Sequence, residues 1–116
     1  MMVSLKNKST NRILIGHLEI AKSFAARGKG LLGRKSLPQD QALWIHRCNS
    51  IHTCFMRFAI DCVFVDKSLK VKAVYTDVRP WRWVFPVWGA NSVIEMSSGE
   101  SMRLGINVGD QLDVGA

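Results

Sequence analysis

The chain has 116 residues, of which 47% are hydrophobic, which suits one domain with a substantial core and is too little for two ordinary domains. This hydrophobic content argues against a disordered chain, and no window approaches the ~18 consecutive apolar residues of a membrane-spanning helix. Three cysteines cannot all pair within one chain, so they indicate free thiols in a reducing compartment. Because residues 1–24 also lack the pattern of a secretory signal, we expect a cytoplasmic protein, with a monomer as the default.

The net charge of +7 is concentrated near the N-terminus. Residues 1–35 carry eight basic side chains and one acidic side chain, whereas residues 36–116 carry eight of each. A cationic segment favours an anionic partner, although a solvated surface is the alternative interpretation. Contact with nucleic acid or an anionic membrane would then run through Lys22, Arg27, Lys29, Arg34 and Lys35.

The first eleven residues are polar and are expected to be disordered or frayed, so the single domain is predicted to span residues 12–116. Residues 13–20 predict a short strand. Residues 21–32 place apolar side chains at helical spacing, which predicts a short amphipathic helix lying on a sheet, and Gly33 is a plausible residue to end it.

The rest of the chain is dominated by strand patterns. Further strands are predicted within residues 42–48, 48–66, 69–78, 92–96 and 107–114, with a proline-containing loop between the third and fourth of these and a turn between the last two. With about six or seven strands and one clear helix, the chain is predicted to be a mainly β or α+β domain. Its antiparallel or mixed sheet would curl into a half-barrel or a sandwich.

The stretch CNSIHTCFMRFAIDCVFVD, residues 48–66, contains all three cysteines. Read with the two-residue period of a strand, its even positions are almost all apolar. Since cysteine is a small residue that is often buried, Cys54 and Cys62 are predicted to fill the core. The even positions that would form this face are His52, Cys54, Met56, Phe58, Ile60, Cys62 and Phe64.

Two chemical roles for the cysteines stay open as alternatives. Their spacings, C-x5-C and C-x7-C, differ from the closer pairs of tetrahedral zinc sites, so neither a metal ion nor another cofactor is predicted. A mixed site of Cys48, His52 and Cys54 is the alternative for a metal. Cys48, beside Arg47, is the alternative for a reactive thiol, which would need an exposed and electropositive setting.

Several motifs, in order along the chain, resemble one family. SIHTCFMRFAIDCVFVD resembles the central motif of the domain-of-unknown-function 192 family, and the other matches are RGKGLLGR, VRPWR, VIEMSSGES and LGINVGDQL. The resemblance covers roughly residues 20–114. The chain departs from the family pattern at Ala59, where proline is usual, and at Cys54, where an aromatic residue is usual. The resemblance implies a small mixed β domain with a short helix, and it implies no particular activity.

Two groups of residues are candidates for a site. In the central motif, His52, Thr53, Met56, Arg57 and Asp61 are polar or soft, and Arg57 and Asp61 flank a bend closely enough to pair. Their pair would be structural, or Arg57 would bind an anion at a pocket where His52 carries a proton. In the second group, Arg79-Pro80-Trp81-Arg82-Trp83, basic and aromatic side chains alternate, which suits a nucleic acid or a planar ligand unless Trp81 and Trp83 point inward.

These residues lead to three functional hypotheses. The leading one is a non-enzymatic binding module for an anionic small molecule or a protein segment, held near Arg57, Asp61, Arg79 and Trp81. The second is a hydrolase or transferase that uses His52 and Asp61 as acid and base. The third is an accessory protein that contacts nucleic acid or an anionic membrane through its basic N-terminal third.

Overall fold

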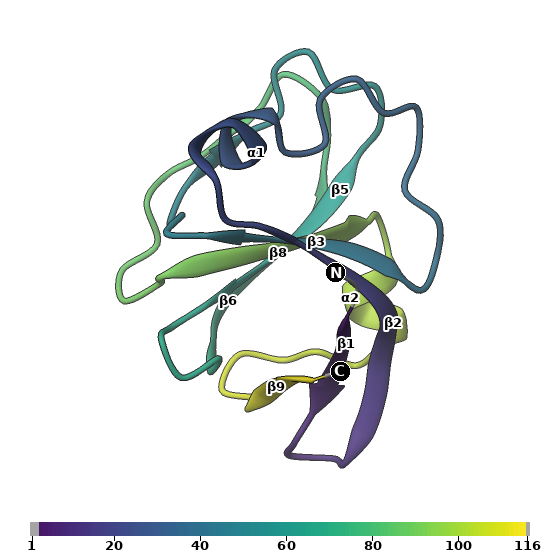
Figure 1. Ribbon diagram of the computed structural model, residues 1–116, viewed down its shortest axis with the longest axis vertical. Coiled ribbons are helices and arrows are strands. Elements are labelled where there is room, and N and C mark those ends of the chain that lie inside the picture. Colours follow the sequence, from purple (N-terminus) through teal and green to yellow (C-terminus); the bar gives the residue numbers. More distant parts are fainter. Residues whose placement is uncertain (1–2, 116) are drawn as a thin grey trace.

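The computed structural model describes residues 3–115, apart from the side chain of Phe24, and contains one curled sheet of seven strands with a separate two-stranded sheet (Figure 1). The strand order in the large sheet is β6-β5-β8-β3-β2-β1-β9. In chain order the elements are β1 (Val3–Asn7), β2 (Arg12–Ala21), α1 (Phe24–Lys29), β3 (Gln41–His46), β4 (Ile51–His52), β5 (Ile60–Val65), β6 (Val71–Val78), β7 (Trp83–Val84), β8 (Ser92–Ser97), α2 (Glu100–Arg103) and β9 (Leu112–Gly115).

The sheet is mixed and nearly closes on itself. Strands β2 and β3 are parallel, and the segment that connects them contains α1, as a parallel crossover requires. The other neighbours are antiparallel. The two edge strands approach each other at one end, where Lys70 and Gln111 form an isolated bridge and the Val71 amide donates to the Asp110 carbonyl at 2.9 Å. The predicted mainly β domain with a curled sheet is confirmed.

The sheet has a core on each face, because successive side chains of a strand point to opposite sides. One core fills the inside of the curl, with Val63 of β5 and Ile94 and Met96 of β8 among its members. The other includes Cys62 and Phe64 of β5 and Val93 of β8, and it is covered by α1 and the long loops. In Figure 1, α1 and these loops lie on one side of β3 and β8, and β1, β9 and α2 lie on the other.

Helix α1 is shorter than predicted. The sequence suggested residues 21–32, but Ala21 still pairs with Ile45 as part of β2, and the helix covers Phe24–Lys29 only. The Ser23 hydroxyl caps its start by accepting from the Ala26 amide at 3.1 Å. Gly30, with a φ of 49°, ends it in place of Gly33. No helix within residues 3–115 is long and apolar enough to cross a membrane.

The prediction that residues 1–11 are frayed is wrong for residues 3–7, and residues 1 and 2 lie outside the described part of the chain. Residues 3–7 form β1, which pairs with both β2 and β9. Val3 and Leu5 alternate with polar neighbours and are buried, which is the pattern of a half-buried strand. Asn7 is also buried, and its side-chain amide donates to Asp110 at 3.1 Å.

The predicted pair between Arg57 and Asp61 does not form. Arg57 is exposed, whereas Asp61 is fully buried in β5. The Asp61 carboxylate accepts hydrogen bonds from the backbone amides of Asp77, Gly99 and Ser101 at 2.9–3.1 Å and from the Ser101 hydroxyl at 2.7 Å. Asp61 therefore fastens the start of α2 and the end of β6 to the central sheet.

Replacing Asp61 should destabilise the fold strongly. The change Asp61→Ala leaves four donors without their acceptor, and each buried donor left unpaired costs about 1–3 kcal/mol, so we expect a loss of at least about 3 kcal/mol. Thermal and urea unfolding measure this. Arg57→Ala serves as the control and should change stability by less than about 0.5 kcal/mol, as expected for an exposed side chain. A larger loss for Arg57→Ala than for Asp61→Ala would contradict this role of Asp61.

Candidate functional site

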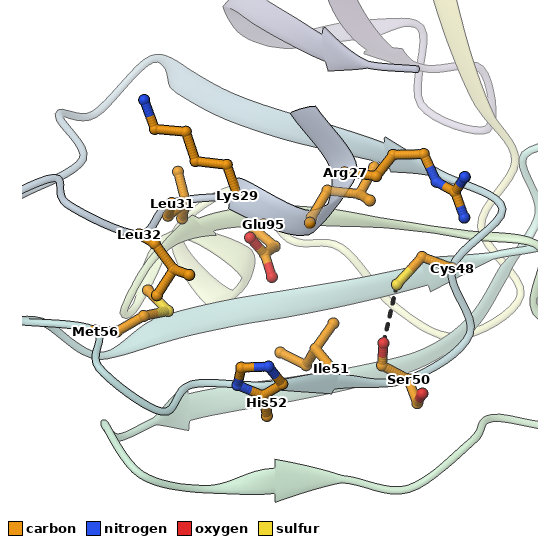
Figure 2. Close-up of a pocket in the computed structure, with 13 residues that line it drawn as sticks. Arg27, Lys29, Leu31, Leu32, Cys48, Ser50, Ile51, His52, Met56 and Glu95 are labelled. Atoms are coloured by element: carbon orange, nitrogen blue, oxygen red, sulfur yellow. Dashed lines mark hydrogen bonds between the residues drawn. The ribbon is translucent and has the colours of Figure 1, made fainter. Parts of the chain in front are cut away.

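A pocket opens between α1 and the two-stranded sheet. Its cavity volume is about 180 Å³. One wall is the end of α1 and the turn after it. The opposite wall is formed by Ser50, the two residues of β4 and Met56. Figure 2 shows Glu95 of β8 between these walls. The lining residues are Arg27, Gly28, Lys29, Gly30, Leu31, Leu32, Ile45, Cys48, Ser50, Ile51, His52, Met56 and Glu95.

Glu95 is the unusual residue of the pocket. It pairs with Leu43 of β3 and Cys62 of β5 in the backbone register, so its side chain shares the face of Val93 and Phe64. Only 4% of Glu95 is exposed. Burial raises the pKa of its carboxyl from 4.5 to about 7, a rise that the charge of Arg34 partly offsets.

The cations near the pocket do not pair with Glu95. Arg27 donates from Nη2 to the Arg47 carbonyl at 3.1 Å, and its buried Nε atom finds no partner in the described part of the chain. Arg34 pairs with Glu19 at 2.5 Å. In Figure 2 the Lys29 side chain extends away from Glu95, and the Arg27 guanidinium lies beyond Cys48. Within residues 3–115, no hydrogen bond reaches the Glu95 carboxylate.

Glu95 differs in this respect from the other buried carboxylates among the described residues, Asp61 and Glu100. Asp61 accepts four hydrogen bonds, and Glu100 accepts two from Arg103 at 2.6 and 2.8 Å. A buried charge is ordinarily paired or hydrogen-bonded, because leaving water is costly. Glu95 alone of these three faces a cavity in place of a protein donor.

His52 and Cys48 complete the polar part of the lining. The His52 ring accepts at Nδ1 from the Cys54 amide at 3.3 Å, and it packs on Trp83 with ring centroids 5.1 Å apart. The Cys48 thiol is half-buried and donates to the Ser50 carbonyl at 2.9 Å. Burial raises the pKa of Cys48, whereas a reactive thiol needs a lowered one, so the setting required of a catalytic cysteine is missing.

The other cysteines behave only partly as predicted. Cys62 is fully buried in the core, as expected, and burial raises its pKa above the usual range. Cys54 is only half-buried, because the 48–66 stretch is broken into β4, a turn and β5. The described residues contain no cluster of three His, Cys, Asp or Glu side chains that could hold a metal ion, so the alternative site of Cys48, His52 and Cys54 does not assemble there.

The structure brings two predicted site residues, His52 and Met56, to the pocket. Thr53 is buried and bridges two loops, since its hydroxyl donates to the Arg79 carbonyl at 2.5 Å and accepts from the Arg82 amide at 2.9 Å. Asp61 shares the face of Val63 and Met96, opposite to Glu95 and the pocket. His52 and Asp61 therefore do not face one cleft.

The segment of residues 81–88, here called the aromatic loop, is exposed. The alternative in which Trp81 and Trp83 point inward is wrong, since they are 57% and 70% exposed. Val84 is buried and pairs with Ile51, so alternation turns Trp83 outward. Trp81 packs on exposed Phe55 with centroids 4.6 Å apart. Arg79 is exposed as well and lies 3.6 Å from Asp77.

The comparisons with known proteins place the chain in a family. The model of the DUF192 family, described as an uncharacterized ACR, matches residues 3–114. The chain belongs to the DUF192 family. Similar relatives include UPF0127 proteins of Thermococcus sibiricus, 32% identical over 94% of this chain and 73% of the relative, and of Pyrococcus horikoshii, 34% identical over 91% of this chain and 94% of the relative.

Two solved structures share the fold. One is a protein of unknown function from Novosphingobium aromaticivorans, with a TM-score of 0.82 and 23% identity over 97% of this chain and 84% of that chain. The other is a putative transcription regulator from Sinorhizobium meliloti, with a TM-score of 0.80 and 21% identity over 97% of this chain and 91% of that chain. At this identity, the likeness supports the fold alone.

Three of the segments that resemble the DUF192 motifs meet at the pocket. RGKGLLGR supplies the wall from Arg27 to Leu32, the central motif supplies Ser50 to His52 and Met56, and VIEMSSGES supplies Glu95. Sequence reasoning missed Glu95 because it stands in an apolar strand run, where its neighbours dominated the interpretation. A single acidic residue in such a run was the clue.

The raised pKa of Glu95 predicts a pH-dependent change in stability. Because the folded-state pKa lies near 7 and the unfolded-state value near 4.5, the folded state holds a proton that the unfolded state has released, and stability falls as pH rises between these values. The full effect is about 3 kcal/mol. Glu95→Gln has no titrating group at this position, so the variant should not lose this free energy of unfolding as the pH rises. Its stability relative to the wild type should therefore increase by about 3 kcal/mol between about pH 4.5 and pH 8.

Urea unfolding of both proteins across this pH range measures the difference. Asp113→Asn, which removes an exposed carboxylate on β9, is the control and should show no comparable pH-dependent gain. A stability difference between Glu95→Gln and the wild type that stays constant with pH would contradict the burial argument.

Proposed function

We propose that this DUF192 protein is a non-enzymatic binding module whose small ligand occupies the Glu95 pocket. The observation that supports the proposal is the buried Glu95 carboxylate, which faces a cavity without a hydrogen-bond partner among the described residues. An unpaired buried charge opposes folding. A ligand that supplies the missing donor would offset that cost in the bound state.

The dimensions of the pocket favour a small ligand. A cavity of about 180 Å³ is below the ~300–1,000 Å³ of sites for drug-sized molecules. Its lining combines apolar side chains, such as Leu31, Ile51 and Met56, with a few polar groups at fixed positions. This combination is typical of binding sites, in which apolar area supplies affinity and polar groups supply orientation.

The arrangement favours binding over covalent catalysis. The Cys48 thiol donates to a backbone carbonyl, and its raised pKa keeps it protonated and weakly nucleophilic. His52 and Asp61 lie toward opposite faces of the sheet, which does not support the predicted acid and base pair. The anionic-ligand hypothesis around Arg57, Asp61, Arg79 and Trp81 is not favoured either, because Asp61 is fully buried and its carboxylate already accepts four hydrogen bonds.

Proton–nitrogen NMR of the labelled protein tests the proposal with a set of small polar molecules. We expect binders to shift the amide signals of residues 28–32 and 50–52 in a saturable way. Glu95→Gln should change which molecules bind, whereas Arg57→Ala, outside the pocket, should leave binding unchanged. Binders that act only on Arg79–Trp83 and bind equally to Glu95→Gln would overturn the proposal.

The exposed aromatic loop favours a second candidate function, contact with an anionic macromolecule. Trp81, Trp83, Phe85 and Trp88 are each between 57% and 97% exposed. Arg57, Arg79 and Arg82 beside or within this segment are exposed too. Aromatic stacking and cationic groups together suit single-stranded nucleic acid or an anionic membrane surface. The exposed Lys22, Lys29 and Lys35 would extend the cationic surface around α1.

Salt dependence tests this second candidate. Binding to single-stranded DNA or to anionic vesicles should weaken steeply as salt rises. Replacing Lys22 and Lys29 with glutamine should weaken it, while the same replacement of Lys67 and Lys70, exposed on a different loop, serves as the matched control. Equal binding by both variants, or binding insensitive to salt, would exclude a role for the basic N-terminal third.

A further inference from the structure

We infer that the Glu95 pocket recognises a protonated primary amine on a short apolar stem, with its ammonium group on the Glu95 carboxylate. This inference rests on the proposed function, since it names the ligand class of the same site. It differs from the anionic ligand that the sequence suggested, because the decisive residue is an acid at the base of the pocket.

The pocket offers acceptors that the protein itself leaves unused or engages only weakly. The Glu95 carboxylate has no donor among the described residues, and the Ser50 carbonyl on the facing wall accepts from the Cys48 thiol, which is a weak donor. None of the neighbouring cations donates to Glu95: Arg27 donates from Nη2 to the Arg47 carbonyl, Arg34 donates to Glu19, and the Lys29 side chain extends away from Glu95. A cationic ligand would therefore supply the donor that the Glu95 carboxylate lacks.

The shape of the pocket favours an alkylammonium over a larger cation. An ammonium carries three donors on one atom, whereas a guanidinium needs a broad planar slot. Leu31, Ile45, Ile51 and Met56 line the pocket together with Glu95 and would contact an apolar stem. The stem would enter between α1 and β4, where Figure 2 shows the two walls facing each other.

Ionised Glu95 is the form that would bind the ammonium. Because burial raises its pKa to about 7, roughly nine-tenths of the carboxyl is ionised at about pH 8 and one-tenth at about pH 6, so affinity should fall about tenfold between them. The charged and titratable groups that face Glu95 or line the pocket with it are Cys62 of β5, Cys48, His52 of β4, Arg27 and Lys29 of α1, and Arg34.

Three probes of similar length test the inference by proton–nitrogen NMR at about pH 8. They are butylammonium, butan-1-ol and pentanoate, which differ in charge. We expect butylammonium to shift the amides of residues 28–32 and 50–52 at the lowest concentration. In Glu95→Gln its affinity should drop to that of butan-1-ol and lose its pH dependence, while Asp113→Asn should behave as the wild type.

The outcomes separate this inference from the proposed function. Pentanoate or butan-1-ol binding in the pocket more tightly than butylammonium would refute the ammonium and leave the pocket as a binding site. Butylammonium shifts confined to other residues, or a tenfold pH effect that persists in Glu95→Gln, would refute the role of Glu95. The absence of any butylammonium shift at high millimolar concentration would also refute the ammonium.

A further arm distinguishes the source of the amine. The chemistry is shared by a free alkylamine and by a lysine side chain of a protein partner. Tighter binding of Nα-acetyl-lysine methylamide than of butylammonium would assign the site to a lysine side chain. The reverse order would assign it to a free small molecule, and the Glu95 dependence should hold for both probes.

Discussion

The alternation of side chains along β8 is the constraint on which the site depends. Strand β8 lies inside the sheet between β5 and β3, so both of its faces are covered and its residues from Ser92 to Met96 are buried. Glu95 shares its face with Val93, and no change of rotamer lets it reach bulk solvent on the other side of the sheet. The Glu95 carboxyl is therefore held on the apolar face of the sheet, and the elements that cover this face leave a cavity above it.

The covering layer consists of short elements that do not form a closed surface. Helix α1 is only six residues long, and β4 and β7 pair through two residues each. Their small size leaves the space over Glu95 open, while the opposite face of the sheet is closed by the curl and fastened by Asp61. The two buried acids therefore differ in their surroundings: Asp61 accepts hydrogen bonds from protein donors, whereas Glu95 faces a cavity.

The sequence predicted the fold better than the site. Apolar and β-branched runs bounded by turn residues identified β2, β3, β6 and β8, because a strand in a sheet with two cores needs such residues. The polar and soft residues of the central motif included His52 and Met56, which do line the pocket. The same motif suggested a pair of Arg57 and Asp61, which does not form, because side-chain partners depend on the path of the loops and a sequence pattern does not give that path. Glu95 was passed over because an acid in an apolar run is recognisable as unpaired only when its neighbours are known.

Side-chain carboxyl NMR of the protein without ligand tests the account most directly. We expect the Glu95 carboxyl to titrate with a pKa of about 7, because it is buried and has no partner among the described residues. A titration midpoint near ~4.3, the ordinary value for glutamate, would contradict the account. Such a value would mean that water or a protein cation such as Arg27 already stabilises the ionised carboxylate. The pocket would then gain nothing from a ligand that donates to Glu95.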